Sequence, residues 1–298
     1  MPRLPAQTFA SLPDADAVAA LAKTAAQAYG APSAAHVVCA PGTQILLPLV
    51  SQLVPPSRAA ILAPTYGEFA RAAALAGHRV VEAREIAEIG DAQLVFIANP
   101  NNPDGRLFAK RDLIALGKIL RARGGLLIVD EAFMDVGPAG QSLAPEVALG
   151  SIVVLRSFGK FFGLAGLRLG FALAVPQLGS RIAGMLGPWA VSGPALAIGA
   201  AALADKAWLD TTRRRLAQSV EKLDVMLVQS GLDIIGGTSL FRLTRTPHAS
   251  ALFNHLGRAG ILVRCFAEQK DWLRFGVPGN ARAWRRLRTA LADFRRTG

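Results

Sequence analysis

The segment IVVLRSFGKFFGLAGLRLG, residues 152–170, decides how the rest of the chain is interpreted. It opens with an apolar run that is typical of a strand buried on both faces. It then places Lys160 among Gly and apolar residues, where partial desolvation favours the neutral amine that forms a Schiff base. The alternative, commoner among lysines in general, is a side chain whose ammonium group reaches solvent. The segment therefore predicts a strand that ends near a reactive lysine.

Further short runs of aliphatic and β-branched residues flank this segment, and stretches of helical periodicity separate them. Several are apolar throughout rather than alternating, as are strands of a parallel sheet covered by helices. We therefore expect an α/β fold whose large domain, residues 1–190, holds a mostly parallel sheet in an α/β/α sandwich. The expected strands are residues 36–40, 59–63, 79–83, 93–98, 125–130, 151–155 and 170–174.

The pattern changes after Pro176 to long Ala- and Leu-rich helical segments, near residues 194–204 and 208–230. Three short candidate strands follow, at residues 240–243, 261–264 and 272–277. This succession predicts a smaller α+β domain over residues 191–298.

Composition and charge exclude several classes of protein. No apolar run of about 18 residues occurs, and the start MPRLPAQTF lacks the apolar centre of a signal peptide, so we expect no membrane partner and a cytoplasmic location. Cys39 and Cys265 have neither disulfide-framework nor metal-ligand spacing, so no metal is expected. The net charge of +12 raises nucleic acid as a partner. Its arginines lie on helix-like stretches without interleaved aromatic residues, which favours solvated helix faces and small anionic ligands instead.

Polar clusters follow four of the expected strands, at the sheet edge where open α/β sheets bind ligands. PGTQ, residues 41–44, can grip a phosphate with backbone N–H groups and the Thr43 hydroxyl. The Pro, Asn and Gly residues of NPNNPDG, residues 99–105, are explained by a tight turn, but a turn does not explain why Asn occurs repeatedly. IVDEAF, residues 128–133, delivers Asp130 at a strand end, where the plain alternative is a capping Asp. The segment with Lys160 is the fourth.

The order of these four clusters resembles the aspartate aminotransferase superfamily, the fold type I enzymes that use pyridoxal 5′-phosphate (PLP), over nearly the whole chain. The resemblance implies that Lys160 binds PLP as a Schiff base and that Asp130 pairs with the pyridine nitrogen. It implies a homodimer as well, because such enzymes usually build each site at a subunit interface. The remaining implied roles are Asn102 at the phenolic oxygen, Tyr66 stacked on the ring, Gly42, Thr43, Ser157 and Arg168 at the phosphate, and Arg274 at a substrate α-carboxylate.

Three longer strings, residues 155–166, 187–194 and 272–278, look like the threonine-phosphate decarboxylase branch of cobalamin biosynthesis, which is similar to histidinol-phosphate aminotransferase. The implied reaction releases CO₂ from L-threonine O-3-phosphate and gives (R)-1-aminopropan-2-yl phosphate. Arg264, on an expected strand near Arg274, is a candidate for the substrate phosphate, with Arg242 a weaker one. The plain alternative for Arg264, as for Arg274, is a surface arginine.

This sequence also departs from the pattern of its relatives. Phe133 stands where many aminotransferases have a Tyr that shares the phenolic oxygen, and Leu12 where they often have a phosphate-contacting Tyr of the partner subunit. Relatives also carry an N-terminal segment before the part that resembles residues 11–14, so we expect a truncated start. Two alternatives stay open: a histidinol-phosphate-like aminotransferase, and a PLP-fold module without turnover.

Overall fold

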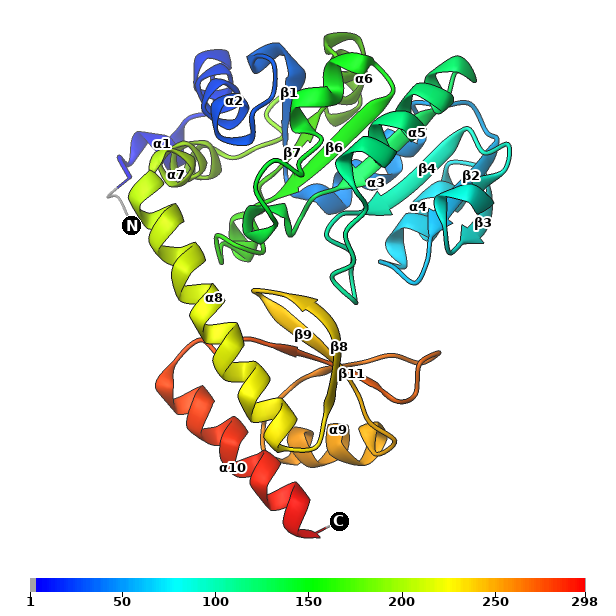
Figure 1. Ribbon diagram of the computed structural model, residues 1–298. Helices are drawn as coiled ribbons and strands as arrows, with labels where there is room; N and C mark the ends of the chain where they lie inside the picture. The colour runs from blue at the N-terminus through cyan, green and yellow to red at the C-terminus, as the bar shows by residue number, and fades with distance from the viewer. Residues whose placement is uncertain (1–3, 298) are drawn as a thin grey trace. The chain divides into compact units, whose positions relative to one another are not determined.

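Seven of the expected strands form one sheet in the computed structural model, which describes residues 4–297 (Figure 1). The order across the sheet is β1-β7-β6-β5-β4-β2-β3. The five strands from β6 to β3 pair in parallel, and β7 is antiparallel to both of its neighbours. The prediction of a mostly parallel sheet is therefore confirmed. The strands are β1 (Val37–Ala40), β2 (Arg58–Leu62), β3 (Arg79–Ala83), β4 (Leu94–Ala98), β5 (Leu126–Asp130), β6 (Ile152–Ser157) and β7 (Gly170–Leu173).

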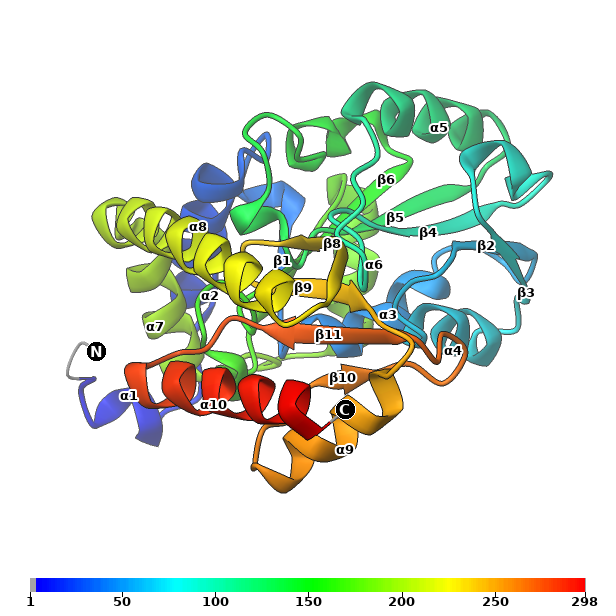
Figure 2. The same ribbon diagram turned by 60° about the horizontal axis from the view of Figure 1, so that its bottom comes forward.

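Helices cover both faces of this sheet, as the apolar runs require. Leu46 of α3, Phe69 of α4 and Ile182 of α6 share one buried cluster with Phe96 and Ile128 of the sheet. Figures 1 and 2 show α5 on the opposite face from α3 and α4. The helices are α1 (Gln7–Ala10), α2 (Ala15–Tyr29), α3 (Thr43–Ser51), α4 (Glu68–Leu75), α5 (Lys110–Ala122), α6 (Pro176–Leu186) and α7 (Gly193–Ala204). Short 3₁₀ turns lie at Ala34–His36, Ile86–Ile89, Met134–Val136, Ala144–Leu149 and Ala165–Leu167.

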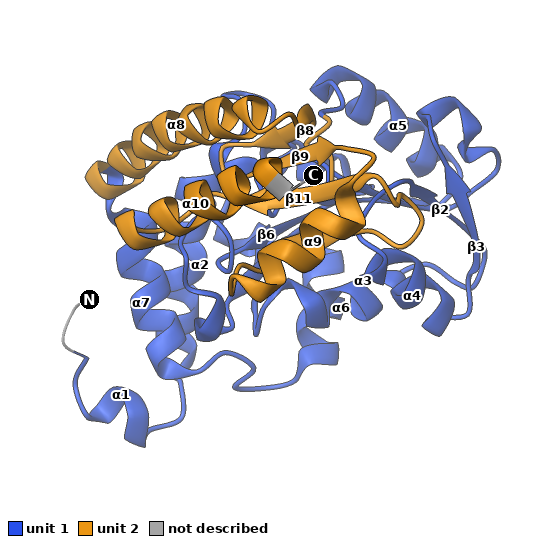
Figure 3. Ribbon diagram, turned by 90° about the horizontal axis from the view of Figure 1, so that it is seen from below, with its two compact units in different colours: residues 1–102, 107–206 blue, residues 103–106, 207–298 orange. Residues whose placement is uncertain are grey.

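A second unit, drawn orange in Figure 3, comprises residues 103–106 and 207–298. Its antiparallel sheet has the order β10-β11-β9-β8. Leu223, Leu252, Phe275 and Leu291 belong to its buried core, which joins the sheet to the helices. The elements are α8 (Lys206–Gln229), β8 (Asp233–Thr238), β9 (Phe241–Arg245), α9 (Ala249–Arg258), β10 (Arg264–Cys265), β11 (Trp272–Gly276) and α10 (Ala281–Thr297).

The division between the units follows Lys206, whereas the sequence placed it after residue 190. The difference arises from α7, which belongs to the first unit because it packs on α2. Gly199 allows this approach, since an added Cβ would collide with Leu169 and press on Leu21. The first three residues of the predicted large domain lie outside the described residues.

β8 was not predicted, and the expected strand 261–264 is a strand only from Arg264. The sequence of β8 is DIIGGT, in which two glycines weaken the strand pattern. They are needed because residues 103–106 lie against β8: a Cβ on Gly236 would collide with the Asp104 carbonyl, and one on Gly105 with the Gly237 carbonyl. Within residues 4–297, none of the helices has both the length and the apolar character needed to cross a bilayer.

Candidate active site

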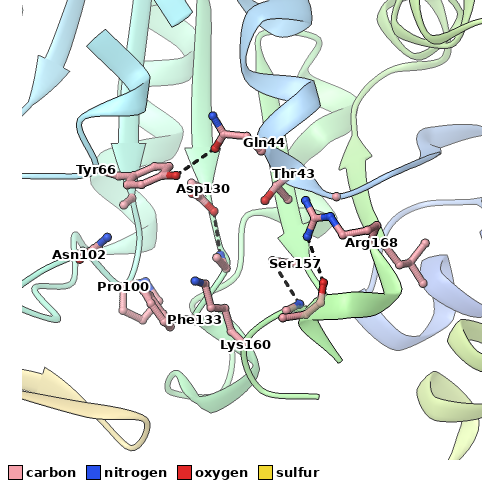
Figure 4. A pocket seen from close by; sticks show the side chains of 16 residues that line it. Thr43, Gln44, Tyr66, Pro100, Asn102, Asp130, Phe133, Ser157, Lys160 and Arg168 are labelled. Atoms are coloured by element: carbon pink, nitrogen blue, oxygen red, sulfur yellow. Dashed lines mark hydrogen bonds between the residues drawn. The ribbon is translucent and has the colours of Figure 1, made fainter. Parts of the chain in front are cut away.

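The parallel strands β4, β5 and β6 end at one edge of the sheet, and β1 ends there too, since it is antiparallel to β7. A cavity of about 230 Å³ lies at this edge (Figure 4). All eight residues that the sequence assigned to the cofactor line it: Gly42, Thr43, Tyr66, Asn102, Asp130, Ser157, Lys160 and Arg168. Segments far apart in the chain therefore meet because their strands run in the same direction.

One end of the cavity is built to hold an anion. Thr43 begins α3, so the first backbone N–H groups of that helix face the cavity with its hydroxyl. The Arg168 guanidinium lies beside Gly42, and a Cβ on Gly42 would come within 2.7 Å of Arg168 Nη2. Likewise, a Cβ on Gly170 would come within 2.8 Å of the Thr43 nitrogen. Glycine at both positions keeps the helix terminus and the guanidinium close together.

Backbone conformation directs Arg168 into this anion site. Its φ of 52° is in the left-handed region, and its Nη1 donates to the Ala165 carbonyl at 3.1 Å. Ser157, at the end of β6, lines the same cavity and accepts a hydrogen bond from the Gly159 N–H at 3.3 Å. A guanidinium, two hydroxyls and a helix N-terminus suit a phosphate dianion.

Asp130 is the last residue of β5, and its Oδ1 accepts from the Ala132 N–H at 2.9 Å. Burial raises the pKa of this carboxyl to about 6, although the Ala132 N–H and the Lys160 ammonium oppose the shift. A carboxylate in such a place gains from a cationic partner, because its charge is costly to bury alone. The side chain is therefore suited to hold a protonated nitrogen.

Lys160 follows β6 and faces the cavity, with Nζ 5.8 Å from the centre of the Phe133 ring (Figure 4). The sequence predicted a partly desolvated lysine, but the side chain is exposed. Its apolar neighbours Phe158 and Phe162 turn into the core instead, where their rings stack at 3.9 Å. The prediction of desolvation is therefore wrong for the described chain, while the prediction that Lys160 belongs to the pocket is supported.

The repeated asparagines after β4 have separate tasks. Asn99 accepts from the Phe108 N–H at 2.9 Å, which closes the loop. Asn101 donates to the Pro64 carbonyl at 2.9 Å and accepts from the Thr65 hydroxyl at 2.8 Å. Asn102 is the one of the three that lines the cavity. The turn therefore needs two of its amides to position the third.

Tyr66 and Gln44 form a second side of the cavity, and the sequence did not single out the role of Gln44. The Tyr66 hydroxyl donates to Gln44 Oε1 at 3.0 Å, as Figure 4 shows. Burial, then the charges of Glu68 and Asp130, raise the pKa of the Tyr66 hydroxyl. The position of Gln44 directly after Thr43 at the start of α3 was the available signal.

Arg156, Glu131 and Asp135 form a buried charge network that was not predicted from the sequence. Arg156 of β6 donates from Nη1 to Glu131 at 2.9 Å and from Nη2 to Asp135 at 2.5 Å. Its guanidinium lies 4.2 Å from the centre of the Tyr29 ring. Burial lowers the pKa of Arg156, but Asp135 and Glu131 outweigh burial and hold it above its ordinary value. A charged residue inside the run IVVLRS was the signal.

Replacing Arg156 with Met is expected to cost about 3–5 kcal/mol of unfolding free energy, because Glu131 and Asp135 would stay buried without their cation. Urea unfolding at neutral pH measures this loss. Arg121→Met, on the exposed face of α5, is the matched control and should change stability by less than about 0.5 kcal/mol. A loss of similar size in both variants would show that the network does not stabilise the fold.

The two predicted substrate arginines lie in the second unit and are neighbours there. Arg264 of β10 is the register partner of Arg274 of β11. Burial, and then the charge of Arg264, lower the pKa of Arg274. Two adjacent guanidiniums favour an anionic ligand. Arg242, the weaker candidate, donates hydrogen bonds of 2.6 and 2.9 Å to the carboxylate of Asp224. Its positive charge is therefore already neutralised within the second unit.

The comparisons with known proteins agree with this geometry. The family "Aminotransferase class I and II" matches residues 2–291. The threonine-phosphate decarboxylases of a Sinorhizobium species and of Pseudomonas aeruginosa are 43% and 40% identical to the chain. These matches cover 98% and 99% of this chain and 87% and 88% of theirs. A histidinol-phosphate aminotransferase of Vibrio vulnificus is 28% identical over 77% of this chain and 70% of its own.

Among solved structures, a histidinol-phosphate aminotransferase from Sinorhizobium meliloti in complex with PLP superposes with a TM-score of 0.87. It is 24% identical, and the match covers 98% of this chain and 84% of that one. At this identity the likeness shows the fold, and it agrees with the α/β architecture predicted from the sequence.

Proposed function

The chain belongs to the aminotransferase class I and II family, in the branch of the threonine-phosphate decarboxylases, and we propose from this premise that it decarboxylates L-threonine O-3-phosphate with PLP. The product would be (R)-1-aminopropan-2-yl phosphate, for cobalamin biosynthesis. One observation carries the proposal: the anion site, Asp130 and Lys160 share one cavity in a chain 43% identical to such a decarboxylase. Histidinol-phosphate aminotransferases are more distant relatives.

The residues present fit PLP. Gly42, Thr43, Ser157 and Arg168 would hold its phosphate, and the lack of a side chain at Gly42 leaves room for the Arg168 guanidinium beside the start of α3. Asp130 would hold a proton at the pyridine nitrogen. Asn102 would contact the phenolic oxygen without help from residue 133, since Phe133 has no hydroxyl, and the Tyr66 ring would lie against the pyridine ring. When bound, PLP supplies an electron sink for the bond that breaks at the substrate Cα.

The chain's own groups would carry out the remaining steps. The Asp130 carboxylate would hold a proton at the pyridine nitrogen, because its buried charge would be stabilised by that cation. Lys160, which lines the same cavity, would bind the cofactor through Nζ and would hold the proton that Cα receives in place of CO₂. Residues that anchor the substrate would decide which Cα bond breaks, and would in this way select decarboxylation over transamination.

Carboxyl-labelled L-threonine O-3-phosphate tests the function directly. The proposal expects labelled CO₂ in stoichiometric amount with aminopropanol phosphate, while the cofactor remains PLP. Accumulation of pyridoxamine phosphate and a keto acid without CO₂ would instead establish an aminotransferase. Bound PLP without turnover of any amino acid would establish a module that lacks activity.

Arg274 and Arg264 are proposed as the two substrate anchors, for the carboxylate and the phosphate respectively. A hydrogen bond to a charged group contributes about 1.5–3 kcal/mol, so Arg264→Ala should lower kcat/KM for the phosphorylated substrate roughly 10- to 150-fold. The activity on free threonine should stay unchanged. Steady-state kinetics with both substrates measure this. Arg282→Ala, at an exposed arginine of α10, is the control. An equal loss on both substrates would remove the phosphate role from Arg264.

We further propose a cytoplasmic homodimer. Phe9, Leu12 and Trp189 expose 69%, 67% and 60% of their surface, and Trp189 lines an apolar groove of about 500 Å³ with Pro13 and Val18. Apolar exposure of this kind favours association. Sedimentation of the active protein should give a dimer, and an active monomer would contradict the proposal.

A further inference from the structure

Gln44 lines the cavity together with Tyr66 and connects Tyr66 to Glu68 of α4. Its Oε1 accepts from the Tyr66 hydroxyl at 3.0 Å, and its Nε2 donates to Glu68 Oε2 at 2.8 Å. Glu68, in the first turn of α4, is itself paired with Arg71 at 3.1 Å. A chain of hydrogen bonds therefore runs from Tyr66 through Gln44 and Glu68 to Arg71.

The chemistry of the partners fixes the direction of every hydrogen bond in this chain. An ionised Glu68 carboxylate can only accept, so the amide nitrogen of Gln44 must face it. The amide oxygen then faces Tyr66, and the phenol must be the donor. The Tyr66 proton is thus committed to Gln44, so Tyr66 offers the cavity its ring rather than a hydrogen-bond donor.

The ring of Tyr66 is held in two ways: by the hydrogen bond of its hydroxyl to Gln44 and by packing of the ring. The edge of the ring lies on Phe69, with centroids 5.6 Å apart and planes 88° apart, and Phe69 is fully buried. Tyr66 is still 38% exposed, so packing alone leaves one side of the ring uncovered. Gln44 supplies the missing restraint from α3, the helix whose first residue, Thr43, lines the anion site.

We propose that Gln44 is a positioning residue, which couples the phosphate-binding end of α3 to the ring of Tyr66 and so orients that ring for PLP. The inference rests on the proposed function in taking PLP as the ligand. Gln44 acts through Tyr66, so its effect on the cofactor should vanish when the Tyr66 hydroxyl is absent.

A double-mutant cycle on PLP affinity tests this coupling. Gln44→Met keeps the length of the side chain but loses both hydrogen bonds, and Tyr66→Phe keeps the ring but loses the hydroxyl. A net hydrogen bond of about 0.5–1.5 kcal/mol corresponds to roughly 2- to 12-fold weaker binding in each single variant. The double variant should bind as Tyr66→Phe alone does, because the hydrogen bond between Tyr66 and Gln44 is already lost once the hydroxyl is absent. PLP titration of the cofactor-free protein gives the dissociation constants.

Two controls separate positioning from damage to the fold. Gln52→Met alters the other end of α3, where Nε2 donates to the Pro48 carbonyl at 3.2 Å, and should leave PLP affinity unchanged. The circular dichroism of bound PLP in its visible band reports how the ring is held, and it should change in Gln44→Met and Tyr66→Phe alike, with thermal stability preserved.

Each outcome decides the matter. Wild-type affinity and dichroism in Gln44→Met would overturn the inference and leave the proposed function intact. Additive losses in the double variant would also overturn it, since Gln44 would then act on the cofactor independently of Tyr66. An unaltered chain that does not bind PLP at all would overturn the proposed function itself, and the positioning role with it.

Discussion

Replacing Lys160 with alanine is expected to abolish measurable CO₂ release. Loss of a positioned acid–base group alone costs roughly 10²–10⁴-fold in rate, and Lys160 would also provide the covalent link to the cofactor. The anion site is made by other residues, so the variant should still take up PLP through its phosphate. The measurement is the rate of labelled CO₂ release by the variant and the unaltered protein at saturating PLP.

Covalent labelling identifies the same lysine without relying on activity. After incubation with PLP and reduction with borohydride, peptide mapping should place the phosphopyridoxyl label on Lys160. Lys118→Ala, at an exposed lysine of α5, is the control and should keep both label and turnover. A label on Lys23 or Lys118 would contradict the assignment.

Replacing Asp130 with Asn is expected to have effects of opposite sign on turnover and on stability. Removing the charged partner of a buried cation costs about 3–5 kcal/mol, so turnover should fall by roughly 10² to several 10³-fold. The cofactor-free variant, by contrast, should be more stable at pH 7. One pKa unit is worth about 1.4 kcal/mol, and since Asp130 partly faces the cavity we expect a gain of about 1–2 kcal/mol.

The pH dependence of this gain identifies its cause. The pKa of Asp130 is about 6 in the folded protein and ordinarily 3.8, so the folded state keeps a proton that the unfolded chain releases. The protonated Asp130 carboxyl therefore makes its whole contribution to the stability of the folded protein below about pH 4, and this contribution is lost as the pH rises through 6. Urea unfolding should show that the cofactor-free variant and the cofactor-free wild type have nearly equal free energies of unfolding at pH 4. At pH 7 the variant should show the whole expected gain. Asp112→Asn, on α5, is the control, and an equal difference at both pH values would exclude Asp130 as the titrating group.

Most of the first unit could be predicted because its sequence pattern is local and strong. Apolar runs such as residues 94–98 are typical of strands covered on both faces, and parallel strands bring their carboxyl ends to one edge of the sheet. Placing Asp130 and Lys160 after β5 and β6 was therefore enough to predict that they share a pocket. The resemblance then supplied their roles, which chemistry at a strand end alone does not specify.

What escaped prediction depends on contacts between distant residues. Arg156 looks like any arginine near the end of a strand until Glu131 and Asp135 are placed beside it. Gln44 acquires a role only when Tyr66 comes within 3.0 Å of it. The exposure of Lys160 was missed because composition does not show which way the neighbouring phenylalanines turn. Similarly, β8 was missed because its glycines serve a close approach by residues 103–106.

The position of β7 between β1 and β6 has a consequence for how the chain folds during synthesis. Ala40 pairs with Gly170, roughly 130 residues later, and Arg168 reaches the anion site from the same part of the chain. At about 5–20 residues per second, a ribosome needs roughly 6–26 seconds to make that interval. Until then β1 has no strand partner, and β6 exposes an unpaired edge once it is made. The phosphate site is thus among the last parts of the first unit to be completed, and a nascent chain that stalls before Gly170 would expose strands prone to pair with other chains.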